Sequence, residues 1–250
     1  MSQPAQAKGE RTCALIVVGN EILSGKVRDS NAYFAVRELR SVGVALKRIV
    51  VTPDELRTIA EEVRYCAYRF EIVITSGGVG PTHDDVTVEA VAAAFGRELI
   101  THPQLEEIVR RHFPARAEAV RLKMALVPQG AVLNLGGEIA YPAVQVENVY
   151  MLPGIPQLFE AKLLTLKERF ATDPYFMRAI YVSAAESTIA EQLCACLERF
   201  PDLMLGSYPT IGDAEYRVKL TLESKDRVYL DAAFDHLLGL LPRVAVVKTE

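Results

Sequence analysis

The stretch TSGGVGPTHDDVT, residues 75–87, follows an apolar run and contains three glycines, a proline and two adjacent aspartates. Glycine-rich turns after a strand often bind anions, because backbone N–H groups with no side chain in the way can approach a phosphate closely. The two aspartates, Asp84 and Asp85, carry the charge that repels such an anion. Any account of this stretch must explain why both features occur together.

The composition indicates a folded chain with one large domain, or a large domain and a small addition. The chain has 250 residues, of which 50% are hydrophobic and 24% are charged, so it can form a substantial core. Its 28 basic and 32 acidic residues give a formal charge of −4, which offers no broad positive surface for nucleic acid or an anionic membrane. No apolar run approaches the roughly 20 residues that span a bilayer. The N-terminus lacks the apolar segment of a signal peptide. We therefore expect a soluble, cytoplasmic protein whose partners include neither nucleic acid nor membrane.

The four cysteines argue against a structural zinc site. They form no C-x-x-C pair, and the chain has only four histidines. Reduced thiols in a cytoplasmic protein are the expectation for all four. They are Cys13, Cys66, Cys194 and Cys196.

Four continuous apolar, β-branched runs predict the strands of a parallel sheet that is covered on both faces. The runs are residues 13–19, 48–52, 71–78 and 148–154. Helical patterns lie between or after them, at residues 30–43, 52–69, 84–96 and 155–170. The second of these helices opens with Thr52 as cap, Pro53 and Glu55, the pattern of a capping box. This alternation predicts a doubly wound, mostly parallel α/β domain.

Residues 97–147 are less regular. We expect a helix near 101–113, a second near 115–125, and two short strands joined across Gly136 and Gly137.

From about residue 176 the pattern changes from continuous to alternating apolar strands, and the predicted order is β-α-β-β-α-β, which is a ferredoxin-like arrangement. The sequence thus predicts a disordered tail at 1–11, an α/β domain at 12–172 and a small α+β domain at 173–250. Such a small domain can bind RNA through stacked aromatic side chains and basic flanks. The alternating strand VKLTLES, residues 218–224, supplies neither, which favours a structural role, such as assembly.

Three loops are candidates for a ligand site, because ligands of open α/β sheets bind beyond the carboxyl ends of the strands. They are residues 19–31, 75–87 and 152–156. In the second loop, Gly77, Gly78 and Gly80 fit either a tight turn with positive φ or a cradle for phosphate at a helix N-terminus. The loop has neither a Walker A lysine nor a true G-x-G-x-x-G pattern, so the motif alone does not decide between them.

Asp84 and Asp85 also have two interpretations. Thr82 and Asp85 match a capping box, and acidic residues in a first helical turn complement the helix dipole. Alternatively, a divalent cation lies between a carboxylate and a substrate phosphate, since Mg²⁺-like ions bind through one or two carboxylates plus phosphate oxygens. This second interpretation explains why acids follow an anion-binding turn.

Polar residues of the first loop are expected at the same edge of the sheet. Glu21, Asp29 and Asn31 fit ligand contacts there, or equally two surface acids and a helix cap. Ser24 and Gly25 fit a turn. In the third loop, Pro153 and Gly154 shape a strand-to-helix turn, and Gly154 lets backbone approach a ligand.

These loops resemble the molybdopterin-binding domain family. The similarity is carried by GNEILSGKVRDSN, TSGGVGPTHDDVTVEAVAAAFG, ENVYMLPGIPQLF and GSYP, and extends from about residue 12 to 250. The chain resembles the N-terminal domain of competence/damage-inducible protein A, and it resembles the N-terminal domain of eukaryotic FAD synthase still more. The separate synthase and amidase domains of those relatives correspond to nothing in these 250 residues. The wider superfamily includes gephyrin-type domains and molybdopterin adenylyltransferases.

The resemblance implies a metal-dependent pyrophosphatase that acts on FAD or ADP-ribose, with Mg, Mn or Co as the divalent metal. It assigns catalysis to Asp84 and Asp85, and metal binding to both together with Asp29. It assigns substrate binding to residues of all three loops: Glu21, Ser24, Gly25, Asn31, Thr75, Gly77, Gly78, Gly80, Thr87, Pro153 and Gly154. Relatives usually have Asp where this chain has Asn20. An amide there weakens a metal-ligand role for that position.

Three functions follow as hypotheses. The leading one is a metal-dependent hydrolase of nucleotide pyrophosphates. The second is a molybdopterin-binding or adenylylating protein of cofactor biosynthesis, since the cradle suits a pterin phosphate equally. The third is a non-catalytic binding module. Following its relatives, the chain is expected to form a homo-oligomer, a dimer or a trimer.

Overall fold

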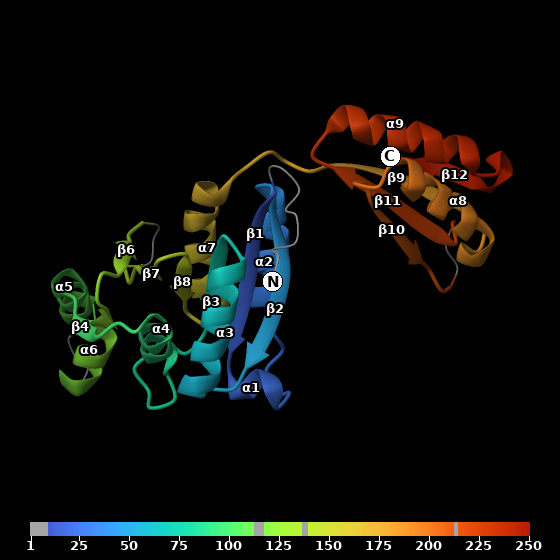
Figure 1. Cartoon of the computed structure of the whole chain (residues 1–250). Helices are drawn as coiled ribbons and strands as arrows, with labels where there is room; N and C mark the ends of the chain where they lie inside the picture. Colours follow the sequence, from blue (N-terminus) through green and yellow to red (C-terminus); the bar gives the residue numbers. More distant parts are fainter. Residues whose placement is uncertain (1–9, 113–117, 137–139, 213–214) are drawn as a thin grey trace. The chain divides into compact units, whose positions relative to one another are not determined.

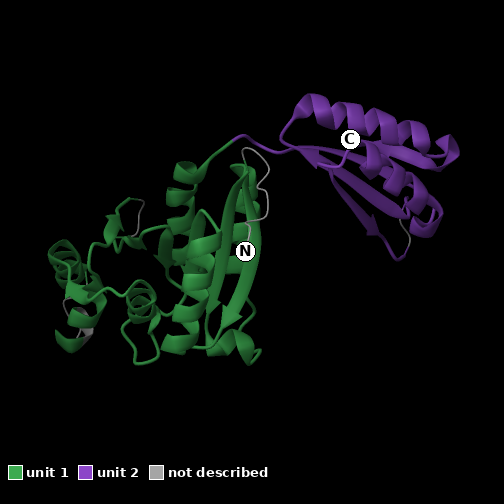
Figure 2. Ribbon diagram, in the orientation of Figure 1, with its two compact units in different colours: residues 1–172 green, residues 173–250 purple. Residues whose placement is uncertain are grey.

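The computed structural model describes residues 10–112, 118–136, 140–212 and 215–250. The chain divides into two compact units, Met1–Thr172 and Asp173–Glu250 (Figure 2). Most of the expected disordered tail lies outside the described residues, whereas Arg11 already belongs to the first strand.

The first unit is built on a six-stranded sheet in the order β2-β1-β3-β8-β7-β6 (Figure 1). Four neighbouring strands are parallel and the last two are antiparallel to their neighbours. The strands are β1 (Arg11–Val18), β2 (Val44–Thr52), β3 (Ile72–Ser76), β8 (Val149–Leu152), β7 (Ala143–Val146) and β6 (Val132–Asn134). The predicted mostly parallel α/β sheet is therefore confirmed.

Helices cover both faces of this sheet, as the continuous apolar strands require. The helices are α2 (Asn31–Ser41), α7 (Pro156–Phe170), α3 (Leu56–Arg69) and α4 (Thr87–Phe95). Successive side chains of β1 point to opposite faces. Leu15 packs in one core with Leu39 of α2 and Phe159 of α7. Ile16 packs in the other core with residues of α3 and α4.

Two helices begin later than the sequence predicts. Thr52 was expected to cap a helix, but it is the last residue of β2 and pairs with Val18, and its carbonyl accepts from the N–H of Gly19 at 3.1 Å. The strand ladder extends to this residue, so α3 starts only at Leu56. Likewise α4 starts at Thr87 rather than residue 84, and it ends at Gly96 as expected.

The irregular region between α4 and β6 lies outside the six-stranded sheet. The helices α5 (Pro103–His112) and α6 (Glu118–Ala125) occupy the two expected helical segments. Two three-residue strands, β4 (Leu99–Thr101) and β5 (Leu126–Pro128), pair in antiparallel fashion and were not anticipated. A four-residue helix, α1 (Asn20–Leu23), also forms in the first loop. Of the two glycines expected to join β6 and β7, Gly137 lies outside the described residues.

The second unit has the predicted β-α-β-β-α-β order. Its strands form an antiparallel sheet in the order β10-β11-β9-β12. The elements are β9 (Phe176–Val182), α8 (Glu186–Arg199), β10 (Met204–Pro209), β11 (Val218–Ser224), α9 (Arg227–Leu240), the 3₁₀ helix η1 (Arg243–Ala245) and β12 (Val246–Thr249). Their shared core includes Ile180, Leu220 and Phe234.

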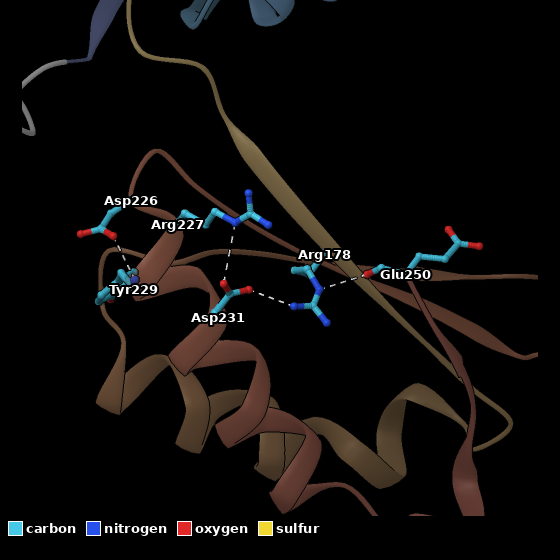
Figure 3. Close-up of polar contacts among 6 residues, drawn as sticks. All are labelled: Arg178, Asp226, Arg227, Tyr229, Asp231 and Glu250. Carbon is cyan, nitrogen blue, oxygen red and sulfur yellow. Dashed lines mark hydrogen bonds and ion pairs between the residues drawn. The ribbon is translucent and has the colours of Figure 1, made fainter.

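A chain of polar contacts joins α9 to the sheet of the second unit (Figure 3). The guanidinium of Arg178 on β9 donates to Asp231 of α9 at 2.9 Å and, through Nε, to the backbone carbonyl of Glu250 at 3.4 Å. Asp231 also faces Arg227 at 3.9 Å. The Arg178 guanidinium lies 3.8 Å from the ring centroid of Phe234. These contacts hold β9 and α9 together and contain no constellation that performs chemistry.

Candidate functional site

The glycine turn after β3 is fixed by its packing. Gly77 has φ +104° and Gly78 has φ +66°, conformations that side chains with a Cβ rarely adopt. A Cβ on Gly77 would lie 2.3 Å from the carbonyl oxygen of Val18, and a Cβ on Gly78 would lie 2.2 Å from Oγ1 of Thr87. Both positions therefore require glycine for backbone conformation and for space.

The first residue of α4 holds this turn in place. Thr87 is fully buried, and its Oγ1 donates to the carbonyl of Gly77 at 2.9 Å. Its backbone N–H donates to the carbonyl of Gly78, also at 2.9 Å. Thr87 thus couples the end of β3 to the start of α4.

Asn31 and Gly154 bring the three predicted loops together. A Cβ on Gly154 would lie 3.2 Å from Cα of Gly77, so the third loop packs directly on the glycine turn. Asn31, the first residue of α2, donates through Nδ2 to the carbonyl of Gly154 at 2.8 Å and to Oγ of Ser76 at 2.9 Å. The loops after β1, β3 and β8 therefore meet at one edge of the sheet.

A pocket of about 800 Å³ opens at this edge. Its volume lies within the range of small-molecule and cofactor sites, roughly 300–1,000 Å³. The glycine turn, Pro153 and Gly154 form part of its wall. Four carboxylates line it: Glu21, Asp54, Asp84 and Asp85. The remaining wall is largely apolar and includes Val18, Val79, Met124, Tyr141, Ile155 and Leu158.

Asp85 belongs to the loop and not to the helix. Its Oδ2 accepts from the backbone N–H of Thr82 at 2.8 Å and from the Thr82 hydroxyl. A Cβ on Gly80 would lie 2.6 Å from the same oxygen, so Gly80 leaves room for the carboxylate. This is the Thr82–Asp85 pair that a capping box predicts, but α4 begins two residues later, and its N-cap Val86 makes no side-chain cap bond. The aspartates therefore do not cap α4.

Asp84 is held in its anionic form. The pKa of its carboxyl lies below the usual value, first because of a hydrogen bond from the Thr82 side chain and then because of its own backbone N–H. The nearby side chains of His83 and Lys123 act in the same direction. Since a hydroxyl has one proton, Thr82 serves only one of the two aspartates at a time. Lys123 of α6 also donates to the carbonyl of Thr82, and this hydrogen bond connects α6 to the glycine loop.

Asp29 lies in a separate small pocket of about 50 Å³. Its Oδ1 accepts from the N–H of Ala32 at 3.1 Å, which gives it a capping role at the start of α2. Glu21 lines both pockets, and Asn31 lines the small one. The Oδ1 of Asn31 is buried and has no hydrogen-bond partner among the described residues. The expected metal set of Asp29, Asp84 and Asp85 is thus divided between two pockets. Within the described ranges, no group of three or more His, Cys, Asp or Glu side chains is placed to hold a metal ion.

Four of the predicted site residues line neither pocket: Ser24, Gly25, Thr75 and Thr87, the last of which is fully buried and bonded to the glycine turn. Ser24 donates through Oγ to the carbonyl of Glu21 at 3.4 Å, and Gly25, with φ +70°, follows in the turn after α1. Thr75 is buried within β3, and its hydroxyl has no hydrogen-bond partner in the described part of the chain. The backbone N–H of Asn20 donates to the carboxylate of Asp54 at 2.7 Å.

The structure adds residues that the sequence did not identify. Asp54 follows the carboxyl end of β2, a position typical of ligand-binding residues, but the capping-box pattern predicts a helix from Thr52 that includes it. Tyr141 donates its hydroxyl to the carbonyl of Met124 at 2.8 Å, and burial raises the pKa of Tyr141 to about 12.

Lys162 of α7 also lines the large pocket, although it is only 3% exposed. Its Nζ donates to the carbonyl of Gly136 at 3.2 Å, and burial lowers the pKa of the ammonium. No local pattern in the sequence marks this position, because only the packing of α7 places it at the pocket.

In the parts of the chain that the structure describes, no helix is long and apolar enough to cross a bilayer.

Comparisons with known proteins agree with this architecture. Residues 14–171 match the family described as "Probable molybdopterin binding domain", and residues 174–250 match "FAD synthase, middle domain". A protein of Archaeoglobus fulgidus is 36% identical over 214 residues, covering 86% of this chain and 92% of that protein. A probable FAD synthase of Caenorhabditis briggsae is 32% identical, covering 95% of this chain but only 50% of that enzyme.

A solved structure shows the same fold. The protein CinA of Thermoplasma acidophilum, described as of unknown function, has a TM-score of 0.60 and 31% identity. The match covers 64% of this chain and 98% of that protein. The chain therefore belongs to the molybdopterin-binding domain family, and its first unit has the fold of CinA-like domains such as that at the N-terminus of FAD synthase.

Proposed function

We propose that the first unit is a divalent-metal-dependent hydrolase of nucleotide pyrophosphates of the FAD or ADP-ribose type. The observation that carries the proposal is the combination, in one pocket of about 800 Å³, of a sterically fixed glycine turn with Asp84 and Asp85 at its end. A turn alone suits an anion, and acids alone suit a cation. Their combination suits a phosphate that is bound together with a metal ion.

The donors present fit a hard divalent cation. Asp84 and Asp85 are adjacent carboxylates that line the pocket. Mg²⁺ and similar ions need only one or two carboxylates when substrate oxygens and water complete their coordination. A bound ion would supply electrostatic polarisation of the phosphoryl group. Asp29 is not part of this set, because it lies in the small pocket and caps α2.

The chain's own residues have distinct tasks in this proposal. The turn at Gly77 and Gly78 would receive a phosphate on the side that faces the pocket, and its conformation depends on glycine because a Cβ would clash with Val18 or Thr87. Thr82 fixes one oxygen of Asp85 by two hydrogen bonds and so sets the direction of that carboxylate. Asp54 lines the pocket and accepts a hydrogen bond from the N–H of Asn20, and in this proposal it would accept the proton of the attacking water. Asn20 contributes only its backbone N–H in this proposal, so an amide side chain in place of a carboxylate leaves the hydrogen bond to Asp54 intact.

Binding of a pterin phosphate without hydrolysis is the second candidate. The family description of the first unit favours it, and the same glycine turn suits the phosphate of such a ligand. A binding module that has lost catalysis is its limiting case. The FAD synthase relative is about twice as long as this chain, so synthesis of FAD is not part of the proposal.

The test is a panel of FAD, ADP-ribose and NAD⁺ incubated with the purified chain and Mg²⁺, Mn²⁺ or Co²⁺, with AMP release measured by chromatography. We expect release of AMP from at least one substrate, which a chelator stops and added metal restores. Tight binding of a pterin phosphate with no AMP release under any metal would support the second candidate instead.

A further inference from the structure

The outer part of the glycine loop, residues 79–85, carries the two aspartates at its end. Val79 packs against the core, whereas Thr82 and Asp84 are exposed. Thr82 donates to Asp85 through its backbone N–H at 2.8 Å and through its hydroxyl. The N–H of Asp85 donates back to the carbonyl of Thr82 at 3.3 Å. These bonds close the loop on itself, but they do not fix its outer part relative to the pocket.

Lys123 supplies a contact from outside the loop. Of the residues that the structure describes, it is the one residue beyond 79–85 that forms a hydrogen bond to this segment, and its acceptor is the carbonyl of Thr82. Lys123 also interacts electrostatically with Asp84. The lysine thus contacts the residue that orients Asp85, and it lies near Asp84 as well.

The end of α6 that carries Lys123 is itself held in place. The carbonyl of Met124 accepts from the hydroxyl of Tyr141 at 2.8 Å, and the carbonyl of Ala125 accepts from the N–H of His102 at 2.9 Å. Met124 and Ala125 are buried, and Met124 also lines the large pocket. The backbone at this end of α6 is therefore a fixed support from which the lysine side chain reaches the loop.

We propose that Lys123 positions the carboxylates of Asp84 and Asp85 for a divalent cation, by holding the carbonyl of Thr82 next to α6. The inference rests on the proposed function for one point, that these two carboxylates bind the cation. Replacing a residue that orients metal ligands typically lowers metal affinity by about 10–100-fold. Lys123 acts through Thr82 and not on a carboxylate directly, so we expect the lower end of this range.

The charge of Lys123 has the opposite effect on a bound cation. An ammonium near Asp84 repels a second positive charge at the same carboxylate, so its removal would by itself strengthen metal binding. A positioning role predicts weaker metal binding when the lysine is replaced. The sign of the change in metal affinity therefore separates the two effects.

The test is the affinity of the full chain for Mn²⁺, measured by electron paramagnetic resonance of the free ion, with Mn²⁺ alone and with Mn²⁺ plus AMP. The phosphate of AMP supplies oxygens that help to complete the coordination of the ion. Lys123→Met removes the hydrogen bond and the charge, whereas Lys123→Arg keeps a charged donor. Lys47→Met is the matched control, because Lys47 pairs with Glu10 at 2.6 Å and does not line the pocket.

We expect Lys123→Met to bind Mn²⁺ about tenfold more weakly than the wild-type chain. Lys123→Arg and Lys47→Met should bind it as the wild-type chain does. If Lys123→Met does not fold, Lys123→Gln provides the same test, since its side chain is uncharged and one atom shorter, and its affinity should also fall.

Unchanged or tighter Mn²⁺ binding by a folded Lys123→Met protein would overturn the inference, even if its melting temperature falls. Failure of the proposed function gives a different result, in which the wild-type chain releases no AMP from the nucleotide panel while its Mn²⁺ affinity still depends on Lys123. If the wild-type chain does not bind Mn²⁺, alone or with AMP, both proposals are wrong.

Discussion

Replacing Gly77 with alanine tests whether the glycine turn is set by its close packing against the end of β1. The new Cβ would lie 2.3 Å from the carbonyl oxygen of Val18, a backbone atom at the end of β1 that cannot rotate away as a side chain can. The backbone at φ +104° adds conformational strain of about 1–2 kcal/mol for a residue with a Cβ. Overpacking of this kind costs about 1–3 kcal/mol. Together these give about 3 kcal/mol, or roughly 6–12 °C in the melting temperature of a domain of this size.

Gly96→Ala is the matched control for this variant. Gly96 also has positive φ, +62°, but a Cβ there meets nothing within 4 Å. Only the backbone strain remains, so the loss should be about 1 kcal/mol, or roughly 2–4 °C. Thermal denaturation followed by circular dichroism measures both variants. A Gly77→Ala protein that melts within 2 °C of Gly96→Ala would refute the packing described for the turn.

Three further predictions concern the rest of the chain. Cys194 is exposed and the other three cysteines are buried, so a thiol reagent should label Cys194 alone in the native protein, as measured by mass spectrometry. Burial raises the pKa of the Cys66 thiol to about 11. Labelling of Cys66 as fast as that of Cys194 would contradict its burial in the core. Burial raises the pKa of Tyr141 to about 12 from 10.0, so the unfolded chain loses that proton first as the pH rises. The stabilising contribution of the Tyr141 hydroxyl is complete below pH 10 and is lost between about pH 10 and 12. The free energy of unfolding from denaturant titrations should therefore fall over this pH range in the wild-type chain, and Tyr141→Phe should lack this part of the fall. Finally, the resemblance leads us to expect a homo-oligomer, and light scattering that gives the mass of a single chain at micromolar concentration would contradict this.

The fold was largely predictable from the apolar pattern of the chain. Side chains of β1 such as Leu15 and Ile16 pack in different cores on opposite faces of the sheet, which is why the strand is continuously apolar. That pattern is specific to a covered parallel sheet. The strands β4 and β5 were missed because they are only three residues long and α5 and α6 separate them in sequence, whereas the equally short β6 is close in sequence to its partner β7.

The helix boundaries were wrong where two local rules competed. Thr52 and Glu55 match a capping box, yet the pairing of Thr52 with Val18 extends the strand and delays α3 to Leu56. Because of the same error, the sequence analysis did not identify Asp54, which lies between β2 and α3 and lines the large pocket.

The glycine turn and its aspartates were identified from sequence because consecutive residues form them. Lys162 and Tyr141 were not, because they reach the pocket only through the packing of α7 and of the segment before β7. Asp29 illustrates the converse. It follows the correct strand, yet a local hydrogen bond to Ala32 holds it in the smaller pocket.

The central claim, that Asp85 acts in metal-dependent hydrolysis, is tested most directly by Asp85→Asn. The amide oxygen of asparagine can still accept from the N–H of Thr82, so the loop keeps its hydrogen bond and the melting temperature should change little. The negative charge that favours a divalent cation is lost. We predict that AMP release from FAD or ADP-ribose, measured with Mg²⁺, Mn²⁺ or Co²⁺, falls to background in this variant. Undiminished release by a well-folded Asp85→Asn protein would contradict the account.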